Sequence, residues 1–162
     1  MASFCFLDKN EKEMWLPNFF DLFYENMQKI APSESTYDEE RERWISTVSE
    51  ALEKEPRRII VCSVNGEFAG FLMYYVRKNL LMVEELQIKK KYQMPLLFYQ
   101  LCKYLGEKLP KEIEYIEAYA HKQNVNSQGI MNVLGMEKID DSRYPHLIHL
   151  RGSFQKAKKR FR

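Results

Sequence analysis

A chain of 162 residues is long enough for one domain with a single sizeable core. Its hydrophobic content of 45% and charged content of 30% are ordinary for a globular protein, and a formal net charge of +2 gives no case for a nucleic-acid or anionic-membrane partner. We therefore expect no nucleic acid and no membrane among its partners.

The cysteines and histidines argue against a metal protein. Three cysteines lack the spacing of metal ligands, and their odd number does not indicate a disulfide framework. The histidines are scattered, and His146 and His149, three apart on the last predicted strand, should face opposite sides. No apolar run reaches the roughly 18 residues of a membrane span, and acidic residues come too early for a signal peptide. We expect a soluble, cytoplasmic protein without metal.

The first third of the chain predicts a strand and two helices. Ser3 to Leu7 is an apolar stretch typical of a strand, and apolar residues at helical spacing predict a helix over 11–31. A second helix should begin at Thr36, because Thr36 and Glu39 have the spacing of a capping box, and should end before Pro56.

The middle of the chain changes to the alternating period of strands. Three antiparallel strands are expected over 59–64, 68–76 and 80–88. Asn65-Gly66 joins the first two and is typical of a type I′ hairpin turn, which needs positive φ at both central residues. An amphipathic helix should then open at Pro95, because proline is favoured in the first turn of a helix.

The last part of the chain returns to strands around one short helix. Residues 113–120 predict a strand, and Asn126 or Ser127 can cap the helix that follows. Gly135 stands where the end of that helix needs a left-handed residue.

Two final strands, at 136–139 and 144–150, should form a hairpin, and the basic tail over 153–162 should be frayed. The predicted order is β-α-α-β-β-β-α-β-α-β-β. We therefore expect one α/β (α+β) domain over 1–152, with a mixed, mostly antiparallel sheet of about seven strands flanked by about four helices.

In this order the chain resembles the GNAT superfamily of acyl-CoA-dependent N-acetyltransferases across nearly its whole length. Val83-Glu84-Glu85-Leu86-Gln87-Ile88 looks like the central fourth strand of that family. Asn124, with Leu134-Gly135-Met136 after it, resembles the family pattern that follows the fifth strand, and the Asn65-Gly66 hairpin lies where the family joins its second and third strands. The resemblance implies transfer of an acetyl group from acetyl-CoA to a primary amine of a small molecule or peptide, by direct attack in a ternary complex.

The cofactor loop of the family, Q/R-x-x-G-x-G/A, is altered here. Gln93 fits, but Leu96 and Phe98 replace the small residues that let a backbone approach phosphate closely. Pro95 also lacks an N–H, although the helix start keeps its partial positive end, and Lys89–Lys91 are either phosphate contacts or a solvated turn. The contacts to acetyl-CoA that the resemblance implies are made by Leu86, Gln87, Ile88, Gln93, Met94, Leu96, Leu97, Phe98 and Asn124.

The resemblance also assigns the base. The thioester carbonyl should accept a backbone N–H near Leu86, and a carboxylate on the same strand should deprotonate the amine. Glu84 and Glu85 are adjacent, so a regular strand sends them to opposite faces. We favour Glu85 as the base, with Glu84 as the alternative; both can instead be ordinary surface carboxylates.

The general acid and the activity itself stay open. The family tyrosine that protonates the leaving thiolate is replaced by Met131, which cannot donate a proton, and Tyr119 or Tyr144 is the candidate substitute. Either tyrosine can instead be a packing residue. The second hypothesis for the whole chain is a degenerate GNAT-like binding or dimerisation module without turnover. A homodimer is one assembly that the resemblance leaves open.

Overall fold

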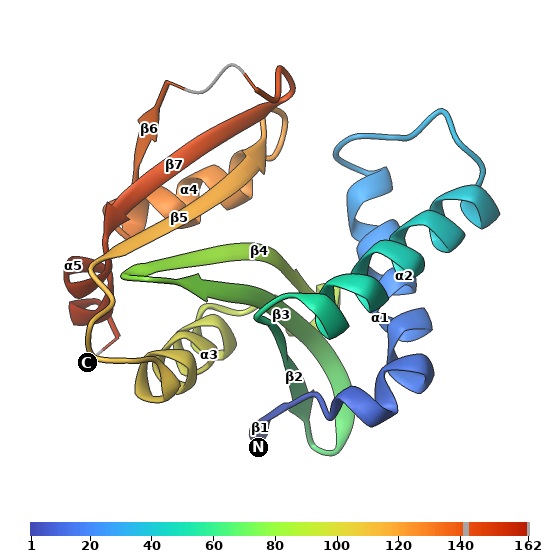
Figure 1. Cartoon of the computed structure of the whole chain (residues 1–162), viewed down its shortest axis with the longest axis horizontal. Coiled ribbons are helices and arrows are strands. Elements are labelled where there is room, and N and C mark those ends of the chain that lie inside the picture. Colours follow the sequence, from blue (N-terminus) through green and yellow to red (C-terminus); the bar gives the residue numbers. More distant parts are fainter. Residues whose placement is uncertain (141–142, 162) are drawn as a thin grey trace. The chain divides into compact units, whose positions relative to one another are not determined.

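The computed structural model describes residues 1–140 and 143–161 of the chain. The strands form one sheet of seven, in the order β1-β2-β3-β4-β5-β7-β6 (Figure 1). The elements are β1 (Ala2–Phe6), η1 (Lys9–Glu11), α1 (Lys12–Gln28), α2 (Tyr37–Lys54), β2 (Arg57–Val64), β3 (Glu67–Arg77), β4 (Leu80–Ile88), η2 (Lys90–Tyr92), α3 (Pro95–Lys108), β5 (Tyr115–His121), α4 (Val125–Val133), β6 (Glu137–Ile139), β7 (Leu147–Ser153) and α5 (Phe154–Lys159). Within the described ranges, no helix combines the length and the apolarity needed to cross a bilayer.

The predicted fold class and the predicted order of strands and long helices are confirmed, and the C-terminal end differs. The last strand begins at Leu147 and runs to Ser153, and the tail that was expected to fray forms α5. Its first turn is capped because the Ser153 hydroxyl accepts from the Lys156 N–H at 3.3 Å. Phe154 and Ala157 are buried, so packing holds a segment whose sequence is mostly basic.

The chain divides into two compact units. The first contains Met1–Met73 and Glu85–Gln93, and the second contains Tyr74–Glu84 and Met94–Arg162. Strands β3 and β4 therefore each contribute residues to both units.

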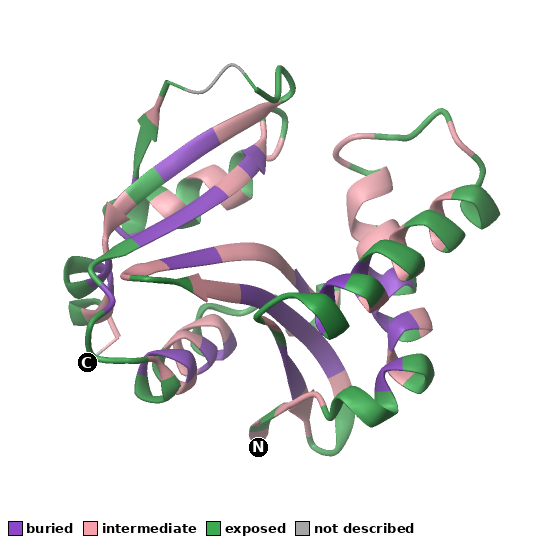
Figure 2. Ribbon diagram, viewed as in Figure 1, coloured by how far each residue is buried: buried purple, intermediate pink, exposed green. Residues whose placement is uncertain are grey.

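The first unit has a core of helix and strand residues. Figure 2 shows the buried segments of β2 and β3 together with the buried positions of α1 and α2. The predicted capping box at the start of α2 is confirmed, with the Thr36 N–H donating to Glu39 Oε2 at 2.8 Å and the Glu39 N–H to Thr36 Oγ1 at 3.3 Å. The core consists of Leu16, Phe19, Leu22, Val48, Leu52, Ile59, Val61, Phe71 and Met73.

The hairpin between β2 and β3 has the predicted turn. Asn65 and Gly66 have φ angles of 51° and 81°, which are the positive values that a type I′ turn requires. This tight turn makes β2 and β3 antiparallel neighbours in the sheet. Strand β1 pairs antiparallel with the other edge of β2, from Ala2↔Val64 to Phe6↔Ile60.

The second unit is built on β5. This strand pairs in parallel with β4 from Leu80↔Tyr115 to Val83↔Ala118, and antiparallel with β7 along its whole length. Helix α4 ends at a glycine of positive φ, Gly135 at 78°, as predicted. Helix α3 ends at Lys108, just before Pro110, and the Gly106 carbonyl accepts from Lys158 Nζ of α5 at 3.2 Å.

Cys62 should be almost inert toward thiol reagents, whereas Cys5 should react. Both lie in the first unit, but Cys62 is fully buried in β2 and Cys5 is exposed on β1. Burial raises the pKa of the Cys62 thiol from 9.0 to about 12, which leaves about a thousandfold less thiolate at pH 8. In a Cys102→Ser background, we expect one rapidly labelled thiol and a second that reacts only after denaturation; two fast thiols would contradict the buried position of Cys62.

Candidate active site

A chain of side-chain hydrogen bonds holds Glu85, the predicted base, on β4. Gln87 is buried, with 6% of its surface exposed, and its Nε2 donates to Glu85 Oε1 at 2.5 Å. Asn26 of α1 donates through Nδ2 to Gln87 Oε1 at 2.8 Å and to the Ile88 carbonyl at 3.2 Å. The Gln87 side-chain amide therefore orients the Glu85 carboxylate. Glu85 is half-buried, so part of its side chain stays accessible to solvent.

The alternative base, Glu84, is also half-buried and precedes Glu85 on the same strand. Successive strand residues point to opposite faces, so the Gln87–Glu85 bond, which joins residues two apart, places Glu85 and not Glu84 on the Gln87 face. Leu86, whose N–H the resemblance assigns to the thioester, lies between Glu85 and Gln87 and is half-buried.

The position of Gln87 depends on a close approach between β3 and β4. Gly70 of β3 is buried, and a Cβ at this position would lie 2.3 Å from the Gln87 carbonyl oxygen and 2.9 Å from Ile88 Cα. Only glycine lets the two backbones come this close.

The basic turn after β4 is largely occupied by contacts within the first unit. Lys91 Nζ lies 2.6 Å from Glu67 Oε2, and the Tyr92 hydroxyl donates to the same oxygen at 2.7 Å. These hydrogen bonds hold the pKa of Glu67 below its ordinary value and raise the pKa of Lys91. Lys89 lies over the Phe68 ring at 5.1 Å, and the Gln93 side chain donates to the Ile88 carbonyl at 2.8 Å. Of the two exposed lysines in this turn, Lys91 pairs with Glu67, whereas Lys90 forms no ion pair with a described residue.

The start of α3, in the second unit, offers few donors for a phosphate. Pro95 has no N–H, and the N–H groups of Leu97 and Phe98 both donate to the Met94 carbonyl, at 3.1 and 3.4 Å. In this first turn the backbone N–H of Leu96 has no acceptor among the described residues. The Leu96 side chain is 62% exposed. A family-type glycine loop would present more amides to pyrophosphate.

The two bulky residues that replace the family glycines have different surroundings. Leu96, like Met94, is exposed, whereas the Phe98 ring makes an edge-to-face contact with Phe161 at 6.2 Å. Leu97 is buried in the core of the unit with 4% exposure, so its side chain serves packing.

Asn124 caps α4. Its Oδ1 accepts from the Ser127 N–H at 3.1 Å, which corrects the expectation that Asn126 or Ser127 is the cap. The reason is geometric, because the chain turns earlier than expected: the Asn124 N–H already donates to the His121 carbonyl at 2.8 Å. Met131 lies in α4 and is half-buried.

Tyr119 and Tyr144, the candidate acids, lie together over a buried polar pair in the second unit. Their rings are in edge-to-face contact at 5.4 Å, and the Tyr119 ring stacks on His149 at 4.3 Å. Arg143 donates to the Tyr119 hydroxyl at 2.9 Å. His149 Nε2 lies 2.8 Å from Glu117 Oε2, and both residues are buried, with 6% and 8% exposure.

His146 is placed differently from the prediction. It lies in the turn before β7, so only His149 is a strand residue, and the expectation that the two occupy opposite faces of one strand is wrong. His149 is opposite Tyr119 in the β5–β7 register and Arg151 is opposite Glu117, which puts these four side chains on one face. Arg151 Nε lies 3.4 Å from Glu117 Oε1.

Sequence reasoning missed Asn26, Gly70 and the Glu117–His149 pair. An isolated glycine inside a strand pattern is a signal of close backbone approach and points to Gly70. The alternation of polar and apolar residues over 115–121 is a signal that Glu117 and Tyr119 share a face. Asn26 carries no local signal, because its partners lie 61 and 62 residues further along the chain.

Comparison with known proteins finds the same fold at low sequence identity. No protein-family model and no curated protein sequence matches the chain. The PaiA N-acetyltransferase of Thermoplasma acidophilum, solved with coenzyme A, is 13% identical over 95% of this chain and 99% of its own, with a TM-score of 0.72. Aminoglycoside acetyltransferase AAC(6')-Ib, also with coenzyme A, is 14% identical over 98% of both chains, with a TM-score of 0.66. FdhC, a nucleotide-linked sugar GNAT, is 12% identical over 98% and 89%, with a TM-score of 0.66. At these identities the likeness shows the fold.

Proposed function

We propose that this chain, which has the GNAT fold, is an N-acetyltransferase that transfers an acetyl group from acetyl-CoA to a primary amine of a small molecule or peptide. The amine nitrogen attacks the thioester carbonyl carbon in a ternary complex. The C–N bond forms, the C–S bond breaks, and coenzyme A leaves as a thiolate that takes up one proton. The nitrogen loses one proton, so the reaction is balanced without a redox partner or a metal.

The observation that carries this proposal is the oriented carboxylate of Glu85. A general base needs a fixed position within hydrogen-bond reach of the proton that it removes. The Gln87 amide supplies that fixed position at 2.5 Å, and the amide is itself held by Asn26. A solvated surface glutamate would have no need of such a buried support. The Leu86 N–H is the donor proposed for the developing oxyanion, and Glu84 is the alternative base.

The proposed contacts to acetyl-CoA follow from the family resemblance. The Leu96 amide and the partial positive charge at the start of α3 are available to an anion, and the exposed side chains of Met94 and Leu96 offer apolar surface. Gln93, Leu97, Phe98 and Asn124 already make internal contacts, so we assign them a supporting role. Tyr119 and Tyr144 are the proposed acids; a thiolate near its ordinary pKa of about 8.5 can also leave without one.

Binding of acetyl-CoA and turnover can be tested separately. Acetyl-CoA at 100 times its dissociation constant should stabilise the native chain by about 2.7 kcal/mol, which a thermal-shift measurement detects. Release of coenzyme A thiol should be measured with a panel of amines that includes a diamine, an aminoglycoside and a lysine peptide. Glu85→Gln should keep the thermal shift and lower turnover by roughly 10²–10⁴-fold, because it removes the base and keeps the shape.

Glu13→Gln is the matched control, because Glu13 is an exposed carboxylate in the first turn of α1. It should leave both the shift and the turnover unchanged. Equal turnover of Glu85→Gln and the control would remove Glu85 as the base and direct attention to Glu84.

The second candidate function is a GNAT-like binding or dimerisation module without turnover. The observation that favours it is the poor phosphate cradle, in which Pro95 has no N–H and the N–H groups of Leu97 and Phe98 are already bonded to Met94. The absence of any thermal shift with acetyl-CoA or coenzyme A would support this module and contradict the enzyme.

A further inference from the structure

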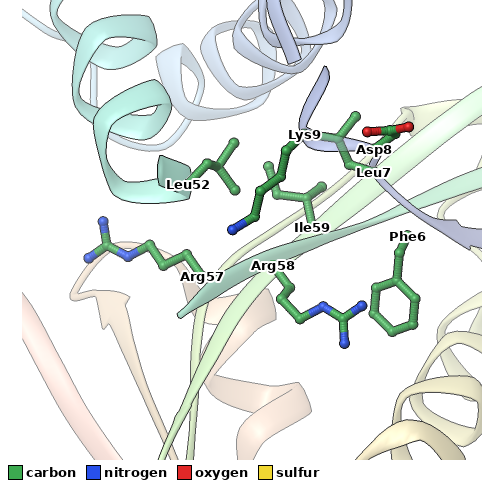
Figure 3. Close-up of a pocket in the computed structure, with 8 residues that line it drawn as sticks. All are labelled: Phe6, Leu7, Asp8, Lys9, Leu52, Arg57, Arg58 and Ile59. Atoms are coloured by element: carbon green, nitrogen blue, oxygen red, sulfur yellow. The ribbon is translucent and has the colours of Figure 1, made fainter. Parts of the chain in front are cut away.

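A pocket of about 360 Å³ in the first unit does not bring its charged groups together (Figure 3). Figure 3 shows the Lys9 side chain extending toward Arg57, on one side of β2. The Arg58 guanidinium lies on the other side, against the Phe6 ring at 3.8 Å. The apolar wall offers little free surface, since Leu52 is 2% exposed. Side chains that do converge lie in the second unit, on the sheet face shared by β5 and β7.

Tyr119 is the residue at which these contacts meet. Arg143 donates to its hydroxyl at 2.9 Å, and its ring stacks on His149 with the ring centroids 4.3 Å apart and an interplanar angle of 20°. The Tyr144 ring makes an edge-to-face contact with it at 5.4 Å. Tyr119 is half-buried and its hydrogen bond to Arg143 is exposed, so a fixed ring carries a hydroxyl that a ligand can reach.

The imidazole that stacks on Tyr119 is itself held by a buried carboxylate. His149 Nε2 lies 2.8 Å from Glu117 Oε2, and the other oxygen of Glu117 lies 3.4 Å from Arg151 Nε. Two apolar residues of similar volume often stabilise a fold as well as a buried pair of ionisable groups does. Stability alone therefore gives no reason for this pair, whereas the pair does fix the plane of the ring on which Tyr119 stacks.

Tyr119 also stands where two strands of the sheet part. The parallel pairing of β4 with β5 ends at Val83↔Ala118, although both strands continue, and Tyr119 is the first residue of β5 after the last pair. On β4, the residues that follow the last pair are 84–86, which include the proposed base and the proposed oxyanion donor. The same reaction needs a proton donor for its leaving group.

The surroundings of the Tyr119 hydroxyl suit a proton donor. A phenol that gives up its proton keeps a negative charge on oxygen, and the Arg143 guanidinium already donates to that oxygen. A hydrogen bond between a cation and an anion is stronger than a neutral one, so Arg143 stabilises the form of Tyr119 that proton transfer leaves behind. Tyr144 is 49% exposed, and no described side chain donates to its hydroxyl.

We propose that Tyr119 is the proton donor of the acetyl transfer, and that Arg143 and the Glu117–His149 pair are the residues that position it. The inference rests on the proposed function. As the C–S bond of the thioester breaks, its electron pair passes to sulfur. The Tyr119 O–H bond breaks and an S–H bond forms, and the phenolate afterwards takes a proton from water. Tyr144 packs against the ring of Tyr119 and is not the donor.

Release of coenzyme A thiol distinguishes the donor from its neighbours. Tyr119→Phe keeps the ring and removes the hydroxyl, so kcat should fall by roughly 10²-fold while the KM for acetyl-CoA changes little. Tyr144→Phe should lose less, and Arg143→Gln should lower kcat by roughly tenfold, because it removes one charge-assisted contact. Tyr115→Phe is the matched control with unchanged kcat, because Tyr115 lies on the same face of β5 and its ring packs under Arg151 at 4.1 Å.

A double variant separates positioning from stability. Glu117→Leu/His149→Leu replaces the pair by apolar residues and should stay folded, but leucine offers no flat ring to Tyr119, so kcat should fall by roughly tenfold. Glu117→Leu/His149→Phe restores a ring at this position and should recover most of the activity. With ¹³C-labelled tyrosine, the ring-current shift that the stacked ring imposes on the Tyr119 signals should be lost in the first variant and kept in the second.

The outcomes separate this inference from the proposed function. If the wild type releases no thiol with any amine, both are overturned. If the wild type is active, the inference alone is overturned when Tyr119→Phe keeps the kcat of Tyr115→Phe, when Tyr144→Phe loses more than Tyr119→Phe, or when the folded leucine double variant keeps wild-type kcat. Arg143 is exposed, so Arg143→Gln tests the positioning even if the double variants fold poorly, and wild-type kcat in Arg143→Gln would contradict it.

Discussion

Gly70→Ala is expected to lower the free energy of unfolding by about 3 kcal/mol, at the upper end of what overpacking a tight core costs. The new Cβ would stand 2.3 Å from the Gln87 carbonyl oxygen and 2.9 Å from Ile88 Cα. Both are backbone atoms, so no flexible side chain can move aside, and β3 and β4 must separate locally. The melting temperature should fall by roughly 6–12 °C for a chain of this length.

The glycine-to-alanine change also lowers the entropy of the unfolded chain, which alone stabilises by about 0.4–1 kcal/mol. Gly129→Ala isolates that effect, because Gly129 lies in helix α4 and a Cβ there would meet no other part of the described chain within 4 Å. It should raise the melting temperature slightly. Equal stability of the two variants in urea and thermal unfolding would show that β3 and β4 do not approach closely at Gly70.

The consequence of Gly70→Ala for the site is as direct as its consequence for stability. Displacing the backbone of Gln87 moves the amide that orients Glu85 and moves the Ile88 carbonyl to which Asn26 donates. At a temperature where the variant is native, we therefore expect the rate of the proposed acetyl transfer to fall by more than the amount of folded protein does.

The order of elements could be predicted because each signal is local. The Asn65-Gly66 turn, the capping box at Thr36 and the left-handed Gly135 all act over a few residues, and the structure has each of them in place. Helix α5 could not be predicted from such signals, because its mostly basic sequence becomes helical through the burial of Phe154 and Ala157. Long-range packing decides that case.

The candidate site shows the same division. The position of Glu85 on its strand is readable from the sequence, but its support by Gln87 and Asn26 depends on how α1 packs against β4. Placing the last strand three residues too early put His146 on the same element as His149. The pairing of His149 with Glu117 depends instead on the register between β5 and β7, which no local signal in the sequence gives.

Glu117→Leu is the second large effect, with an expected loss of about 3 kcal/mol in the free energy of unfolding, because breaking a buried pair from one side leaves the partner uncompensated. The carboxylate accepts from His149 at 2.8 Å and lies 3.4 Å from Arg151, and Glu117 itself is 8% exposed. Leucine fills most of the volume but accepts no hydrogen bond. Arg151 can turn toward water, since its side chain is 43% exposed, so the loss arises chiefly at His149.

A double-mutant cycle distinguishes this buried pair from a general packing defect. His149→Leu should cost a similar amount, whereas the double variant Glu117→Leu/His149→Leu should recover to within about 1 kcal/mol of the wild type, because two apolar side chains satisfy each other. Glu137→Leu on β6 is the control: an exposed carboxylate opposite Arg151 whose replacement should change stability little. If the two single losses simply add in chemical denaturation, the two side chains do not act as a pair, and each is important only for the space that it fills.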